Sequence, residues 1–151
     1  MVLATKILNI LNSMLPPLNP EQGVEYLQSV LYDSAFSANV RIDRKPLPAA
    51  LFYLLSDWTL DTTLTTVKEA ANIQVFFFDT CPFDAKGEDK DNIIKRMETL
   101  AKEFIAKVMA DKSLIIKTDK IKIQSSYGKF DKFVCGVAVS FQIEEKQASC
   151  L

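Results

Sequence analysis

Acidic residues gather between positions 79 and 91, and they are the side chains of this sequence best suited to chemistry. The stretch 73–97 reads IQVFFFDTCPFDAKGEDKDNIIKRM. Carboxylates are the ligands that Mg²⁺ and Ca²⁺ prefer, so one interpretation is a divalent metal site formed by Asp79, Asp84, Glu88, Asp89 and Asp91. Their spacing lacks the alternation of an EF-hand loop, however, and Lys86 and Lys90 lie among them.

Helix capping explains the same acids more simply. A long amphipathic helix is predicted over about residues 89–110, from apolar residues at intervals of three and four. Acids at its start satisfy free backbone N–H groups and interact favourably with the helix dipole. Gly87 alone is no phosphate-binding loop, because the spaced glycines and the Lys-Ser or Lys-Thr pair are absent. We therefore expect Glu88, Asp89 or Asp91 to act as caps, and we expect no metal and no cofactor.

The chain offers few residues for nucleophilic catalysis. It contains no histidine, which excludes a Cys-His or Ser-His nucleophile. Its three cysteines, Cys81, Cys135 and Cys150, are spaced like no zinc or disulfide framework, so we expect them to be reduced in a cytoplasm. One enzymatic alternative remains: Cys81 as a thiolate near Lys86, assisted by Asp79 or Asp84 at the end of a strand.

Length and charge favour one compact domain without a surface that binds nucleic acid through its phosphates. The chain has 151 residues, of which 48% are hydrophobic, and this is enough for a single domain over 1–151. Its 18 basic and 19 acidic residues give a net charge of -1. Proteins that bind DNA by its phosphates need a concentrated basic patch, so such binding is not expected.

The two ends of the chain have different expected roles. Residues 1–17 predict an amphipathic helix that stops at Pro16 and Pro17, because its apolar residues, among them Leu8 and Leu11, recur near helical spacing. It is too polar and too short for a membrane span and lacks a signal-peptide cleavage site. We expect it to dock on the domain's own core or on a neighbouring chain. Residues 146–151 are expected to be a frayed tail.

The elements between these ends predict an α+β fold, a mostly antiparallel sheet of about five strands with helices packed on it. A second helix is expected from Pro20 to Ala35, and the long helix should separate two groups of strands. A Gly136 within the last strand is expected to mark a bulge or a close backbone approach. The expected strands are 36–43, 49–60 and 73–80, with 61–72 as a loop or an exposed strand extension, and a hairpin over 120–145 that turns near Tyr127 and Gly128.

Three aromatic residues are candidates for a subunit contact. In the strand 73–80, Phe76 and Phe78 point to the face opposite Phe77, so only one of these sets can lie under the long helix. An antiparallel sheet often leaves its other face open, and adjacent exposed phenylalanines would mark an interaction site. Trp58 is either a lid on the core or an interface anchor.

The pattern of the whole chain resembles the tail-completion proteins of long-tailed bacteriophages and prophages, the group of tail terminators and head-tail connectors. The resemblance covers about residues 18–146 and rests on order, lengths and strand texture. The segments that carry it are PEQGVEYLQSVLYDSA, KPLPAALFYLLSD, IQVFFFDTCPFDAKGEDKD, NIIKRMETLAKEFIAKVM and GVAVSFQIEE. The additional N-terminal helix and the polar stretch 61–72 depart from the compact pattern of the group.

This resemblance implies a structural role in the virion, reached after assembly in the host cytoplasm. Subunits of such proteins join into a ring, six-fold or twelve-fold, beside portal, adaptor or tail-tube proteins, and DNA passes through the centre. A near-neutral chain suits a channel in which DNA must slide, since each phosphate contact would add to a salt-dependent grip. The alternative is a monomeric adaptor with an open sheet face.

Overall fold

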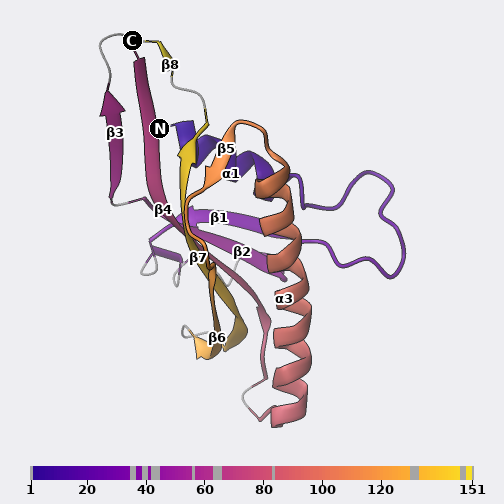
Figure 1. The fold of residues 1–151 in the computed structure, drawn as a ribbon. Helices are drawn as coiled ribbons and strands as arrows, with labels where there is room; N and C mark the ends of the chain where they lie inside the picture. The colour runs from indigo at the N-terminus through magenta and orange to yellow at the C-terminus, as the bar shows by residue number, and fades with distance from the viewer. Residues whose placement is uncertain are drawn as a thin grey trace.

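The computed structural model describes residues 2–34, 37–38, 41, 45–55, 57–62, 66–82, 84–129, 133–146 and 149–150. Its helices are α1 (Val2–Asn12) and α3 (Gly87–Ala110). Its strands are β1 (Ser29–Asp33), β2 (Ala49–Tyr53), β3 (Trp58–Thr62), β4 (Thr66–Thr80), β5 (Leu114–Ile116), β6 (Lys122–Lys129), β7 (Val134–Glu145) and β8 (Ser149–Cys150). The predicted α+β class is confirmed, and the strands form one mixed sheet (Figure 1).

The sheet is organised around β4, its longest strand. The order is β1-β2-β4-β7-β5, with β3 and β8 also pairing with β4 and β6 pairing with β7. Only β1 and β2 run parallel, and the other described pairs are antiparallel. Because β4 is 15 residues long, one of its edges is shared in turn by β3 and β2. Within the described residues the sheet has eight strands, more than the expected number of about five.

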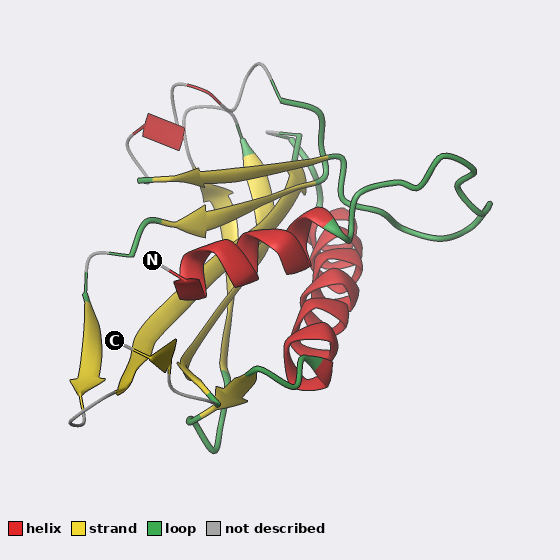
Figure 2. Cartoon of the chain, turned by 90° about the horizontal axis from the view of Figure 1, so that it is seen from above, coloured by secondary structure: helices red, strands yellow, loops and turns green. Residues whose placement is uncertain are grey.

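Both helices cover the same face of the sheet (Figure 2). The predicted long helix is confirmed as α3, and its apolar face buries Met97, Leu100, Phe104 and Val108. Phe104 packs between Phe77 of β4 and Phe141 of β7, with ring centroids 5.6 Å and 6.1 Å away. The N-terminal helix is confirmed as well, and it docks on the domain's own core by burying Leu3, Ala4, Ile7 and Leu11, with Leu8 partly buried beside them. No described helix is apolar over enough of its length to cross a membrane.

The opposite face of the sheet has a second, smaller core. Phe76 and Phe78 are fully buried there and stack on each other, with ring centroids 5.0 Å apart. The buried residues around them are Leu31, Ala38, Ala49, Leu51 and Val134. The expectation that Phe76 and Phe78 form an exposed patch is therefore wrong, because side chains of the neighbouring strands β1, β2 and β7 flank them and Ala38 packs in the same cluster.

The predicted helix from Pro20 to Ala35 is also wrong. Residues 13–28 form a long connection without helix or strand, and β1 follows at Ser29. Gly23 has a φ of 79°, a left-handed conformation that interrupts a helix and favours glycine. The apolar spacing of Val24, Leu27, Val30 and Leu31 resembles one face of a helix, but Leu31 instead alternates as a strand residue into the smaller core.

Other predicted boundaries also differ from those in the structure. The expected strand 49–60 is two strands, β2 and β3, that pair with different parts of β4. Of the expected strand 36–43, Ser37, Ala38 and Arg41 are helical and the other positions lie outside the described residues. Ser149 and Cys150 pair with β4, so the prediction of a frayed tail is wrong for these two residues. The short strand β5 was not expected.

Gly136 lies where β7 and β4 approach each other closely, as predicted. A methyl group built on Gly136 would lie 1.9 Å from the carbonyl oxygen of Phe77 and 2.8 Å from the Cα of Phe78. Beside it, Tyr127 and Gly128 of β6 fall within a register shift between the pairs Ser126↔Gly136 and Lys129↔Val134. The expected turn at these two residues is therefore an irregularity within a strand, and β6 continues to Lys129.

A disulfide joins the end of β4 to the start of β7. Cys81 and Cys135 are bonded, with Cα atoms 5.4 Å apart and a sequence separation of 54. Both are buried, and the Cys81 N–H donates to the carbonyl of Phe133 at 3.0 Å. The expectation of reduced cysteines is wrong for this pair, because the register Asp79↔Cys135 places Cys81 just beyond the paired region.

Candidate functional site

The acidic segment does not form a metal centre among the residues that the structure describes. Glu88 and Asp89 lie in the first turn of α3, where their charges face the positive end of the helix dipole. The N-cap residue is Lys86, and no side chain caps the helix by a hydrogen bond. The expected capping hydrogen bond is therefore wrong. The positions of these acids agree with the other expectation, a favourable interaction with the helix dipole.

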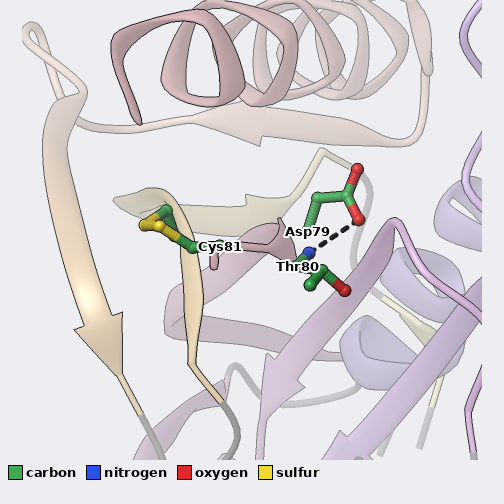
Figure 3. Close-up of a disulfide and its surroundings, with 4 residues drawn as sticks. Asp79, Thr80 and Cys81 are labelled. Carbon is green, nitrogen blue, oxygen red and sulfur yellow. Dashed lines mark hydrogen bonds between the residues drawn. A yellow bond between two sulfur atoms is a disulfide. The ribbon is translucent and has the colours of Figure 1, made fainter. Parts of the chain in front are cut away.

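Arg96 links Asp79, at the start of the acidic segment, to Glu25 in the connection 13–28. Its guanidinium lies 2.8 Å from a carboxylate oxygen of Asp79 and 2.6 Å from one of Glu25. The Glu25 carboxylate, followed by Asp79, raises the pKa of Arg96 above its ordinary value. Asp79 also accepts the Thr80 N–H at 2.7 Å, beside the disulfide (Figure 3). This carboxylate and Cys81 thus serve structural bonds, and the Cys81 sulfur is not a free thiolate.

The surface best suited to a partner is an arm made of β3 and the first part of β4, residues 58–62 and 66–71. Figure 1 shows this arm at one end of the molecule, on the side away from the 13–28 connection. All five residues of β3 are exposed. Two of them are large and apolar, Trp58 at 44% exposure and Leu60 at 56%. Trp58 therefore lies on the surface, as the interface interpretation of the sequence requires.

The edge of β3 that faces away from β4 has no strand partner within the described parts of the chain. Unpaired N–H and C=O groups on an edge are a template for another strand, and proteins usually protect such edges with lysine, proline or a bulge. β3 has the sequence WTLDT and contains neither lysine nor proline. It therefore combines an open backbone edge with exposed apolar side chains.

The arm is joined to the body of the domain through Glu69. This side chain is 6% exposed, and one carboxylate oxygen accepts the Val2 N–H, at the start of α1, at 2.9 Å. The Glu69 N–H in turn donates to the carboxylate of Glu145 on β7 at 3.0 Å. The other carboxylate oxygen of Glu69 is buried and makes no hydrogen bond in the described structure. Glu69 thus caps α1 from a distant strand and opposes its dipole with a negative charge.

Replacing Glu69 with alanine is expected to reduce the free energy of unfolding by about 1–2 kcal/mol, because α1 loses a cap and an anion at its N-terminus. Glu69→Gln retains an acceptor oxygen and should cost less. Denaturant titration measures both. Glu98→Ala is the control, because Glu98 makes an exposed pair with Lys102 that is worth about 0.5 kcal/mol or less. Equal losses for Glu69→Ala and Glu98→Ala would contradict the capping role.

The other face of the arm is braced by charges. Glu144 of β7 lies 3.0 Å from the Lys68 amine on β4 and 3.1 Å from the Lys117 amine after β5. The hydrogen bond from Lys68 is the main cause that holds the pKa of Glu144 below its ordinary value. The carboxylate therefore stays ionised to lower pH than an ordinary glutamate, and it connects β7 to β4 and to the residue that follows β5.

Beside these ion pairs, a polar trough lies on the face of the sheet that the helices leave open. It has a volume of about 470 Å³, and its floor includes Asn72 and Gln74 of β4 with Ser140 and Gln142 of β7. Asp57 lies in its wall, as do Lys120 and Lys122. Amide and hydroxyl groups of this kind form hydrogen bonds to polar ligands, but the lining brings together none of the residues that the sequence suggested for catalysis.

The connection 13–28 is the second element that leaves the body of the domain, as Figures 1 and 2 both show. Its ends meet, because the Leu27 N–H donates to the carbonyl of Met14 at 3.1 Å. Long loops without secondary structure are uncommon in compact domains, where they usually are functional, as lids or binding loops, or serve as linkers. Leu18 in this segment is fully exposed, so the connection presents an apolar side chain far from the arm.

Of the residues expected at an interface, the structure leaves only Trp58 available. Phe76, Phe78 and Leu11 are fully buried, and Leu8 is partly buried in the main core. The sequence reasoning missed Leu60 and Glu69. Alternation across WTLDT, followed by TVKE, was the signal for an exposed two-stranded arm, but the segment 61–72 was interpreted as a loop or an exposed strand extension, and its pairing was not predicted. No protein-family model matches this chain, and no curated protein matches it.

Proposed function

We propose that the protein is a structural subunit of a tailed bacteriophage that assembles into a ring at the head-tail connector or the tail terminus. The observation that supports this best is β3, an exposed edge strand that carries Trp58 and Leu60 on an arm. A subunit that joins identical neighbours needs such a projecting surface, and a ring needs contacts on two different sides. The arm and the 13–28 connection lie at opposite ends of the molecule (Figure 2).

Charge and sequence pattern agree with the same proposal. The net charge of -1 suits a channel that DNA passes without binding. The order of α3 and the strands on either side of it is the feature that resembles the tail-completion group. The ring adjoins portal, adaptor or tail-tube proteins and contains six or twelve copies, as the resemblance implies. The direct test is to purify particles from the source of this sequence, identify the protein by mass spectrometry and locate it by cryo-electron microscopy. Its absence from the particles would overturn the proposal.

A variant with Trp58→Ser and Leu60→Ser is expected to fold normally and to be excluded from particles. Both side chains are about half exposed, so the loss of folding free energy should be small, whereas a contact that buries them loses two apolar anchors. Thermal unfolding and the amount of protein in particles are the two measurements. Met109→Ser is the control, because Met109 is 70% exposed on α3, away from the arm. Normal incorporation of the Trp58 and Leu60 variant would mean that the arm is not the contact.

A polar-ligand binding module is the second candidate, favoured by the trough on the open sheet face. It agrees with the adaptor that the sequence offered as an alternative. A monomeric protein that is absent from particles and binds a polar ligand, with loss of binding after Gln74→Ala, would favour this candidate over the ring.

A further inference from the structure

Among the strands whose burial the structure describes, β3 and the first part of β6 combine an open edge with exposed side chains. Among the described residues β3 pairs only with β4, and β6 pairs only with β7. The side chains of β6 from Lys122 to Gln124 are exposed, as are those of β3. The outer strands β1 and β5 are less suitable for a partner, because both are partly buried. The two exposed edges belong to opposite sides of the sheet.

Strand direction makes these two edges compatible. From β3 through β4 and β7 to β6, each strand runs antiparallel to the one before it. A second copy in the same orientation therefore presents a β3 that runs antiparallel to the β6 of the first. Such copies continue one antiparallel ladder, and their helices stay on the same face of the combined sheet. This is a head-to-tail contact, the kind from which rings are built.

The side chains on the two edges also match. On the helix-covered face, Trp58 and Leu60 of β3 would meet Ile123 of β6, which is 46% exposed. Their faces follow from the register, since Trp58 is opposite Ala71 and Ile123 is opposite Val139, and both partners belong to the main core.

On the open face, Asp61 would lie near Lys122, which is opposite Ser140 in the register. Neither Asp61 nor Lys122 has an ion-pair partner among the residues that the structure describes. Opposite charges across neighbouring strands stabilise their pairing. The apolar and the charged residues thus fall on corresponding faces of the two edges.

We propose that β3 of one copy pairs with β6 of the next copy, so that the sheets of neighbouring subunits join into one continuous sheet. This inference rests on the proposed function for its ring, but the pairing is a property of two defined strands and has its own test. Its occupant is a second copy of this chain.

The test is oxidative cross-linking of a variant with Asp61→Cys and Lys122→Cys, in a chain where Cys150 is replaced by serine. Within one chain, β4 and β7 lie between these positions and leave about 14 Å across the sheet. A disulfide needs Cα atoms within about 7 Å, so a bond between the two new cysteines must join different copies. We expect a ladder of dimers, trimers and larger species on a non-reducing gel, both with concentrated protein and with purified particles.

Matched variants show whether the ladder reports this pairing. Glu103→Cys with Lys122→Cys places one cysteine on the exposed face of α3 and should give no more than collisional dimers. A strong dimer from Asp61→Cys alone would indicate that two β3 edges meet, and it would overturn the proposal. The absence of a ladder in solution and in particles would overturn it as well.

The same experiment separates this proposal from the proposed function. Particles that contain the protein but give no ladder would mean that the pairing is wrong while the ring function stands. A ladder from a protein that is absent from particles would mean that the pairing is right and the virion function wrong. As a second readout, Asp61→Lys or Lys122→Asp alone should weaken assembly several-fold, and the two together should restore it. Failure of the double variant to recover would contradict the contact between these two edges.

Discussion

Replacing Gly136 with alanine is expected to prevent β4 and β7 from pairing in their native register. The added methyl group would lie 1.9 Å from the Phe77 carbonyl oxygen, 2.8 Å from its carbonyl carbon and 2.8 Å from the Phe78 Cα. All three are backbone atoms of the central strand, so no side-chain rotation relieves the contact. We expect a loss of about 3 kcal/mol or more in the free energy of unfolding, at the upper end for overpacked positions.

Gly87→Ala is the matched control for this prediction. It makes the same chemical change at the first residue of α3, where an added methyl group meets nothing within 4 Å. Because alanine loses less backbone entropy than glycine, the control should be neutral or more stable by about 0.5–1 kcal/mol. Circular dichroism during denaturant unfolding measures both variants. A Gly136→Ala protein as stable as the wild type would mean that β4 and β7 are far enough apart at this position to hold a methyl group.

A variant with both Cys81→Ser and Cys135→Ser is expected to be the second most damaging change. The disulfide closes a loop across a sequence separation of 54, and the chain-entropy relation for such a loop predicts a loss of about 4 kcal/mol. Two buried hydroxyl groups in the main core add to the cost if they lack hydrogen bonds. Unfolding in denaturant, followed with and without a thiol reductant, measures the loss.

The reductant is also the control for the cysteine prediction. Wild-type protein unfolded in reductant should approach the stability of the double variant, whereas the double variant itself should not respond. Cys150→Ser should leave the response of the wild type to reductant unchanged, because the disulfide joins the other two cysteines. Mass spectrometry of the alkylated native protein should find one free thiol. If three thiols react before unfolding, the disulfide is absent in solution and the prediction fails.

The local spacing of apolar residues was enough to predict the elements in which buried residues recur with the same period along the whole length. α3 repeats apolar residues at helical spacing for 24 residues, and its core side is the predicted one. The end of β4 and most of β7 follow the alternation of strands that the sequence indicated. Gly136 was identified for its lack of a side chain within an apolar strand, which is a local signal with a single physical meaning.

The features that the sequence did not predict depend on partners far away in the chain. Phe76 and Phe78 were expected to be exposed because nothing local indicates that they pack with Leu31, Ala38 and Leu51. Cys81 and Cys135 form a disulfide only because the register of β4 and β7 brings them together. Glu69 looks like a surface acid until α1 is placed over it.

Of the two apolar residues on the candidate surface, the sequence predicted only Trp58, for a related reason. Trp58 was identified from its size. Its exposure, however, depends on the position of β3, which projects from the body of the domain together with the first part of β4 (Figure 1). A strand that pairs on one edge and is exposed on both faces has the same alternation as one that lies over a core. Which of these applies is decided by tertiary structure, and that also determines whether Leu60 is a core residue or a contact.

The hydrogen bond between Leu27 and Met14 has a consequence for how this protein can change over evolutionary time. Because the two ends of the intervening segment are held together, its length can vary without moving α1 or β1, and lengthening a loop costs little entropy. Insertions, deletions and substitutions among the exposed residues 16–24 are therefore tolerated by the fold, as is usual for surface loops, whereas Glu25 keeps its ion pair with Arg96. Remodelling of these residues therefore offers a route to new partners that leaves the sheet, α1 and α3 unchanged.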